Sequence, residues 1–283
     1  MRVTRPSTLD DALTALASDP EATPLAGGTD LMVDLNFGRA RPAHLVTIRR
    51  LPELRRCEIG ADGSICCGCG LPYANLQQRP LDPAFLQAVR TVGSPQIRSL
   101  GTLGGNLGTC SPAGDLLPVL AALDATLVVR SAGHERRLRF DDWMQGPKRP
   151  ALAPGELVVS ARWRRAGAAQ AFLKAGVRNA MVIAIANLAL VADRRRRRVR
   201  VAMGCVGPRI LRAPAAERFA EGLFCESGWE RPLSPTPAAA ARFGELCALA
   251  TTPIDDVRGS ACYRRHVTAL MGRRALARVG AVV

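Results

Sequence analysis

The chain has 283 residues, of which 48% are hydrophobic and 4% aromatic, and its formal net charge is +15 at pH 7. This length suits one large domain or two ordinary ones, and the apolar content is sufficient for a sizeable core. No apolar run approaches the ~18 residues that cross a bilayer, and residues 1–6 carry no hydrophobic signal region. We therefore expect a cytoplasmic protein without membrane insertion.

Short strands alternate with helices over residues 1–166, a pattern typical of an α+β domain. A helix is expected over 9–17, where leucines share one face and Ser7 can cap the first turn. Ala61-Asp62-Gly63 is a strong hairpin signal. The elements expected in this region are strands at 24–26, 45–48, 56–59, 64–68, 126–130, 136–140 and 156–163, and helices at 30–37, 81–92, 95–100 and 115–123.

The remaining residues, 167–283, are predicted to form a smaller domain. Five consecutive arginines, 194–198, separate two of its predicted strands. That position predicts a solvated hairpin tip, and no aromatic residues interleave with the arginines to stack bases, so we expect no nucleic-acid partner. The expected elements are an antiparallel meander at 171–177, 182–191 and 199–205, then helices at 214–223, 237–250 and 261–279.

Two glycine-rich segments, 25–31 and 102–106, are the most informative motifs, and each pairs two glycines with a hydroxyl or amide side chain. Paired glycines let backbone N–H groups approach a ligand, and successive N–H groups bind phosphate oxygens. Two such turns facing each other would suit the pyrophosphate of a dinucleotide. Neither matches the GxGxxG fingerprint or a triphosphate loop, and glycine pairs usually only make turns.

The second segment and its surroundings resemble the flavin-binding subunit of molybdenum hydroxylases, the relatives of xanthine dehydrogenase and carbon monoxide dehydrogenase. The resemblance runs over 92–115 and returns at 172–181 and 254–260. Phrases at 30–37 and 148–154 look most like bacterial xanthine dehydrogenase flavin subunits. The resemblance implies an α+β fold, with a two-subdomain FAD-binding module of the PCMH type followed by a C-terminal antiparallel sheet with helices.

The same resemblance implies the residues of the site. The two glycine segments wrap the FAD pyrophosphate from opposite sides, Asp115 bonds FAD hydroxyls, and Val158 touches the flavin. Lys174, the one implied catalytic residue, lies near the isoalloxazine, where an ammonium would favour the anionic reduced flavin. The ordinary alternatives are a helix cap for Asp115, a core position for Val158 and a surface position for Lys174. The implied cofactor-binding residues are Pro24, Leu25, Ala26, Gly27, Gly28, Thr29, Asp30, Leu31, Val92, Thr102, Leu103, Gly104, Gly105, Asn106, Thr109, Asp115, Val158 and Lys174.

Lysine occurs only at 148 and 174 among the 39 basic residues, which leaves 37 arginines. A site that needs a compact ammonium would resist replacement of lysine by arginine, which adds weight to Lys174, although chance retention is the alternative. Some relatives carry acidic residues where this chain has 180–182, so the resemblance leaves the electron acceptor open.

The nine cysteines form no CxxC pair, and Cys66 and Cys67 point to opposite faces if they lie on a strand. We therefore expect free thiols, no metal and no iron–sulfur cluster on this chain. None of the three histidines lies in a glycine segment, so FAD is expected to be bound noncovalently.

The resemblance implies an electron-transfer subunit of a xanthine dehydrogenase-type complex. Its partners would be a molybdopterin-binding large subunit and a [2Fe-2S] small subunit, arranged as a dimer of heterotrimers, with NAD⁺ or another molecule as electron acceptor. Two alternatives stay open at this point: a stand-alone FAD-dependent reductase on a similar fold, and a basic binding protein without catalysis.

Overall fold

The computed structural model describes residues 1–282, and packing divides them into two units. Unit 1 comprises residues 1–79, 94–110 and 125–164, and unit 2 comprises residues 80–93, 111–124 and the chain from Arg165 on. The two units therefore interleave along the chain. The division into consecutive domains, 1–166 and 167–283, is a different one and stays a prediction.

Unit 1 contains three sheets. A three-stranded parallel sheet has the order β1-β3-β2, a five-stranded antiparallel sheet has the order β4-β5-β10-β6-β7, and β8 pairs with β9. The elements of unit 1 are β1 (Arg2–Thr4), α1 (Leu9–Ala17), β2 (Ala22–Leu25), α2 (Leu31–Asn36), β3 (His44–Thr47), η1 (Pro52–Arg55), β4 (Cys57–Ile59), β5 (Ser64–Gly68), α3 (Tyr73–Leu76), α5 (Pro95–Leu100), α6 (Leu103–Thr109), β6 (Thr126–Ser131), β7 (His134–Arg139), η2 (Phe140–Asp142), β8 (Met144–Gly146), β9 (Arg149–Pro150) and β10 (Leu157–Arg164).

Helix α1 connects β1 to β2 and buries its predicted leucine stripe against strands β3, β6 and β10. The helix is capped by Thr8, whose hydroxyl accepts a hydrogen bond from the Asp11 N–H while the Asp11 carboxylate accepts one from the Thr8 N–H. Ser7 donates to the Asp11 carboxylate instead. The prediction of Ser7 as the cap was therefore wrong by one residue.

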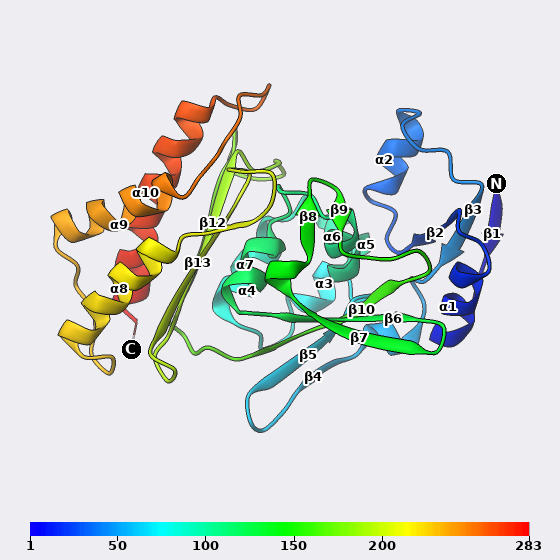
Figure 1. The fold of residues 1–283 in the computed structure, drawn as a ribbon, viewed down its shortest axis with the longest axis horizontal. Coiled ribbons are helices and arrows are strands. Elements are labelled where there is room, and N and C mark those ends of the chain that lie inside the picture. The colour runs from blue at the N-terminus through cyan, green and yellow to red at the C-terminus, as the bar shows by residue number, and fades with distance from the viewer. Residues whose placement is uncertain (283) are drawn as a thin grey trace. The chain divides into compact units, whose positions relative to one another are not determined.

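Unit 2 is built on a four-stranded antiparallel sheet with the order β11-β12-β13-β14. Helices α8, α9 and α10 cover one face of this sheet (Figure 1), and α4 and α7 pack on the other. Every position of β12 is buried because both faces are covered. The elements of unit 2 are α4 (Pro83–Thr91), α7 (Leu116–Ala122), β11 (Gln170–Ala175), β12 (Ala186–Asp193), β13 (Arg198–Gly204), β14 (Leu211–Arg212), α8 (Pro214–Ser227), α9 (Pro237–Leu249) and α10 (Ala261–Gly280).

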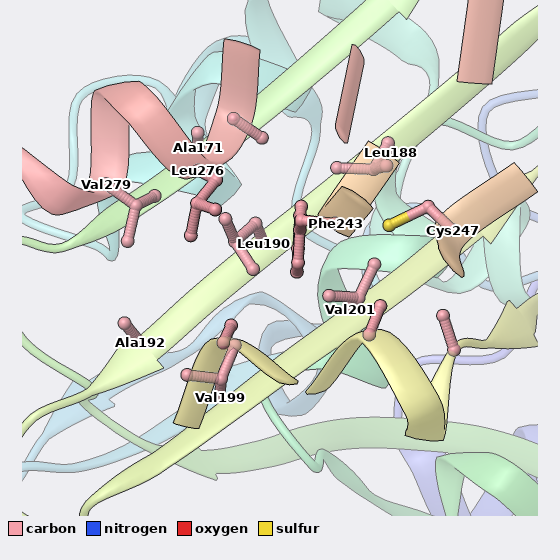
Figure 2. Packing of buried hydrophobic residues seen from close by; sticks show 14 of the residues in the cluster. Ala171, Leu188, Leu190, Ala192, Val199, Val201, Phe243, Cys247, Leu276 and Val279 are labelled. Carbon is pink, nitrogen blue, oxygen red and sulfur yellow. The ribbon is translucent and has the colours of Figure 1, made fainter. Parts of the chain in front are cut away.

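The core of unit 2 lies between the sheet and its helices. Leu188 and Leu190 of β12 and Val201 of β13 pack near Phe243 of α9 and Leu276 of α10 (Figure 2), and all five are fully buried. Burial of one such side chain stabilises the fold by about 1.5–3 kcal/mol relative to exposure. The sheet is therefore a firm support for the polar side chains on its opposite face.

The structure corrects several sequence predictions. The second glycine segment is the start of helix α6 rather than a turn, and the strand predicted from residue 182 begins at Ala186. The predicted three-stranded meander has a short fourth strand, β14. The short elements β1, α3 and β9 were not predicted, because two to four residues show no periodic pattern.

Arg194 differs from the other residues of the arginine run. Its guanidinium donates hydrogen bonds to the carbonyls of Trp229, Arg231 and Val282. The run does form the hairpin between β12 and β13, and residues 195–198 are exposed as expected. The prediction of a solvated tip was wrong for Arg194, which joins the hairpin to the ends of helices α8 and α10.

The predicted fold class is confirmed: an α+β part is followed by a C-terminal antiparallel sheet with helices. None of the helices within residues 1–282 combines the length and the apolar character that a membrane span needs.

Candidate functional site

The first glycine segment is a turn between strand β2 and helix α2. Gly28 has φ +72°, in the left-handed region that favours glycine. The five N–H groups from Gly27 to Leu31 donate to no acceptor within residues 1–282. Successive backbone donors without protein partners are the arrangement that binds phosphate oxygens. The phosphate-binding role of this turn stays a prediction.

Gly27 brings the two glycine segments together within unit 1. A Cβ atom on Gly27 would lie 1.9 Å from the carbonyl oxygen of Leu100, so only glycine permits this approach of the two backbones. Nearby, the Thr109 hydroxyl at the end of α6 donates to the Asp30 carboxylate at 3.2 Å. The two segments predicted to face a common ligand therefore lie side by side.

The backbone N–H groups of the two glycines in the second segment are already bonded within the protein. The Gly104 N–H donates to the Cys69 carbonyl at 2.7 Å, and the Gly105 N–H donates to the Thr102 hydroxyl at 2.9 Å. These bonds fix the first turn of α6 and leave neither N–H group for a phosphate. The expectation that Gly104 and Gly105 donate to the pyrophosphate was therefore wrong.

What the second segment offers a ligand is open surface and a side-chain acceptor. A Cβ atom on Gly104 would lie 2.7 Å from the Cβ and the carbonyl oxygen of Cys69, so Gly104 serves packing. A Cβ atom on Gly105 would meet only the Thr102 hydroxyl, at 3.2 Å. The side-chain Oδ1 of Asn106 is buried and has no partner within residues 1–282. A buried acceptor without a protein partner can accept a hydrogen bond from a ligand or from an ordered water.

Asp115 and Lys174 form a buried ion pair in unit 2. Lys174 Nζ lies 2.6 Å from Asp115 Oδ2 and 3.1 Å from the carbonyl oxygen of Thr91, at the end of α4. Asn187 donates to the other carboxylate oxygen at 3.0 Å. Asp115 precedes α7 but makes no capping bond with its side chain, and both ionised side chains are at most 10% exposed. The helix-cap and surface-lysine alternatives are therefore excluded.

The electrostatics of this pair differ from those of an isolated lysine. Burial raises the pKa of the Asp115 carboxyl, and the charge of Lys174 and the hydrogen bonds from Lys174, Asn187 and Thr91 oppose that rise. The ammonium of Lys174 is compensated by the carboxylate, so the two together carry no net charge when both are ionised. The electric field of Lys174 at a bound flavin would therefore be partly cancelled by the opposite field of the Asp115 carboxylate.

The other predicted contacts lie on the elements expected for them, except that Val92, predicted as the last residue of a helix, lies one residue beyond its end. Pro24 belongs to strand β2, and Val92 follows helix α4 directly. Val158 lies on β10 and is 3% exposed, at a bulge in the pairing with β6. Its role as a flavin contact stays a prediction, as do the roles of the other site residues.

Sequence reasoning missed the group that fixes the segment 254–260. Arg264 of α10 is 2% exposed and pairs with Asp256 at 2.6 Å. Its guanidinium also donates to the carbonyls of Ile185 and Cys205. No local pattern marked Arg264, because its partners are far apart in the sequence, although the family resemblance had drawn attention to Asp256.

Two protein families match consecutive parts of this sequence. A family described as the FAD-binding domain in molybdopterin dehydrogenase matches residues 1–162, and the CO dehydrogenase flavoprotein C-terminal domain matches residues 171–279. The first match alone covers more than half of the chain. The chain therefore belongs to the FAD-binding subunits of the molybdopterin-dependent dehydrogenases.

Individual relatives agree with this assignment. A putative xanthine dehydrogenase FAD-binding subunit from Escherichia coli strain K12 is 30% identical over 227 residues, 77% of this chain and 78% of that protein. The nicotine 6-hydroxylase medium subunit of Paenarthrobacter nicotinovorans is 30% identical over 292 residues, 99% of this chain and 98% of that protein. A structure of reconstituted CO dehydrogenase from Oligotropha carboxidovorans superimposes with a TM-score of 0.88 at 25% identity, covering 100% of this chain and 98% of that one.

These comparisons confirm the family resemblance and the presence of an FAD-binding domain on this chain. The chain is an oxidoreductase subunit of the molybdopterin-dependent dehydrogenase type. In homologous complexes the molybdopterin and iron–sulfur cofactors belong to partner subunits. The stand-alone reductase and the basic binding protein are set aside.

Proposed function

We propose that this chain holds FAD noncovalently and is the electron-transfer subunit of a xanthine dehydrogenase-type complex. Electrons would reach the FAD from [2Fe-2S] clusters on a small subunit and leave to NAD⁺ or another acceptor. A molybdopterin-binding large subunit would oxidise the substrate. The three chains would assemble as a dimer of heterotrimers in the cytoplasm.

The observation that carries the proposal is the row of five N–H groups from Gly27 to Leu31 that have no acceptor within residues 1–282. These donors would bind the pyrophosphate oxygens of FAD. The surface at Gly105 leaves room beside them, and the unpartnered amide oxygen of Asn106 would accept a hydrogen bond from the cofactor. When bound, FAD supplies the redox chemistry, because a flavin exchanges electrons singly or in pairs.

Lys174 and Asp115 are proposed to adjust the electrostatics around the cofactor. The Thr91 carbonyl and the Asp115 carboxylate hold the Lys174 ammonium in one place. Asp115 keeps a bond from Asn187, so its carboxylate is oriented even when Lys174 moves. The pair can therefore favour either redox state of a nearby flavin, depending on which charge lies closer to it.

The substrate is proposed to be chosen by another subunit. Relatives of this chain carry names that refer to xanthine, nicotinate and glyceraldehyde, which are a purine, a pyridine carboxylate and an aldehyde. Subunits similar to this one therefore serve complexes that act on different substrates. That pattern supports a division of labour in which this chain handles electrons.

Removal of FAD from the purified complex tests the proposal. Substrate should still bleach the iron–sulfur absorption of the flavin-free complex, while reduction of NAD⁺ or an artificial acceptor should stop and return when FAD is added back. The apo complex should take up one FAD per copy of this chain. Acceptor reduction at full rate without FAD would contradict the proposed electron path.

A further inference from the structure

Cys57 and Cys67 are paired across two neighbouring strands of unit 1. The two residues are partners in the register of the antiparallel hairpin β4–β5, and their sulfur atoms lie 3.0 Å apart. Both are free thiols. Neither belongs to the glycine segments or to the Asp115–Lys174 pair, so the proposed function leaves them without a role.

The hydrogen-bond pattern of the hairpin explains why the two sulfur atoms meet. The Gly68 N–H donates to the Arg56 carbonyl, so the neighbouring pair, Cys57 and Cys67, falls on a position without backbone hydrogen bonds. Cα atoms at such positions are about 4.5 Å apart, within the range of roughly 4.4–6.8 Å that a disulfide spans. Strand β4 is also an edge strand of its sheet, so it can move slightly to let a bond form.

The two thiols differ in access and acidity. Cys57 is half-buried, whereas Cys67 has no exposed surface. The hydrogen bond between them lowers the pKa of the Cys57 thiol, with help from the charge of Arg79, and the same bond and burial raise the pKa of Cys67. Because the thiolate is the reactive form, Cys57 is the residue that attacks an oxidant first.

We propose that Cys57 and Cys67 are a reversible oxidation site that closes to a cross-strand disulfide when hydrogen peroxide reaches the hairpin. The Cys57 thiolate attacks one peroxide oxygen, the O–O bond breaks, and the departing hydroxide takes a proton to become water. The Cys67 sulfur then attacks the sulfenic sulfur of Cys57, and the S–O bond breaks. The second water leaves with the Cys67 proton. Two thiols are oxidised by two electrons, and one peroxide is reduced to two waters.

The disulfide would tie the edge strand to a part of the sheet that supports α6. Strand β5 ends at Gly68, and the carbonyl of the next residue, Cys69, accepts the Gly104 N–H at 2.7 Å. Cys66 is adjacent in sequence but points to the opposite face of the strand. Cys66 is therefore the matched control for a bond that depends on strand geometry.

The test uses the purified full-length chain with FAD, reduced, freed of reductant, treated with hydrogen peroxide and then alkylated. No lysine or arginine lies between Cys57 and Cys67, so trypsin leaves them in one peptide, whereas cleavage at Glu58 or Asp62 separates them. We expect a disulfide-linked peptide pair and a fall in titratable thiols from nine to seven, reversed by dithiothreitol. Cys57→Ser should abolish the link, and Cys66→Ser should retain it.

The variant Cys67→Ser provides an independent test if Cys57→Ser does not fold. In Cys67→Ser the sulfenic acid on Cys57 has no resolving thiol and should be trapped by dimedone. The proposal is overturned if Cys57 and Cys67 are both alkylated after peroxide treatment of the wild-type chain. It is equally overturned if the link survives in Cys57→Ser or is lost in Cys66→Ser.

Discussion

Replacement of Lys174 by methionine would leave the buried carboxylate of Asp115 without its positive partner and should lower the free energy of unfolding. The ammonium lies 2.6 Å from that carboxylate, and the two side chains are 10% and 6% exposed. Methionine keeps the apolar stem but removes the ammonium, and the Thr91 hydroxyl and the Asn187 amide are the donors that Asp115 retains within residues 1–282. Removal of one partner from a buried ion pair costs about 3–5 kcal/mol, so the free energy of unfolding should fall by that order near neutral pH.

The size of this loss should depend on pH. Burial already raises the pKa of Asp115, and removal of Lys174 takes away the largest opposing influence. A carboxyl whose pKa is higher in the folded state binds more protons there, so its stability contribution is present at low pH and is lost as pH rises through the folded-state pKa. The difference in the free energy of unfolding between wild type and Lys174→Met should therefore become smaller on acidification and larger toward alkaline pH.

Urea unfolding at a mildly acidic and a mildly alkaline pH measures both effects. The double variant Lys174→Met/Asp115→Asn removes both charges and should recover most of the stability lost in the single variant, because no charge is left unpaired. Equal stability of Lys174→Met and wild type at both pH values would refute the argument. So would a double variant less stable than Lys174→Met.

Other consequences can be tested on the isolated chain. Gly105→Ala should weaken FAD binding at least tenfold, about 1.4 kcal/mol. The control Gly108→Ala, in the same helix, should not weaken it, because nothing lies within 4 Å of the added methyl. Equal flavin content in the two variants would show that Gly105 does not belong to the site. Gly27→Ala should lower the melting temperature even without FAD, since its methyl would meet a backbone carbonyl; an unchanged apo melting curve would argue against that close approach. If the pair in unit 2 lies near the flavin, the midpoint potential should fall in Lys174→Met and rise in Asp115→Asn, by about 30 mV for each ~1.4 kcal/mol; unchanged potentials would place the pair away from the flavin.

Local rules were sufficient for much of the fold. The helix predicted over 95–100 has those bounds, because Pro95 favours the first helical position and the Ser94 hydroxyl accepts a bond from the Ile97 N–H. The hairpin predicted around Ala61-Asp62-Gly63 is confirmed, and Gly63 adopts φ +79°, a conformation that glycine favours. In each case the determining contacts lie within a few residues of one another.

Contacts distant in sequence account for what could not be predicted. Gly104 and Gly105 disfavour a helix, yet the Gly104 N–H finds the Cys69 carbonyl, and tertiary packing overrides the intrinsic preference. Lys174 and Asp115 are 59 residues apart, so no local pattern could reveal that each neutralises the other. Family resemblance identified both residues as important and missed their pairing.

The content and release of flavin from the purified chain test the central claim most directly. The visible spectrum of the chain expressed alone should show one FAD per polypeptide, and acid precipitation should leave that FAD in the supernatant. This result follows from the five N–H groups of the first glycine turn, which have no acceptor in the described part of the chain and would hold a pyrophosphate by hydrogen bonds alone. A colourless chain that fails to take up added FAD, or flavin that remains with the precipitated protein, would contradict the account.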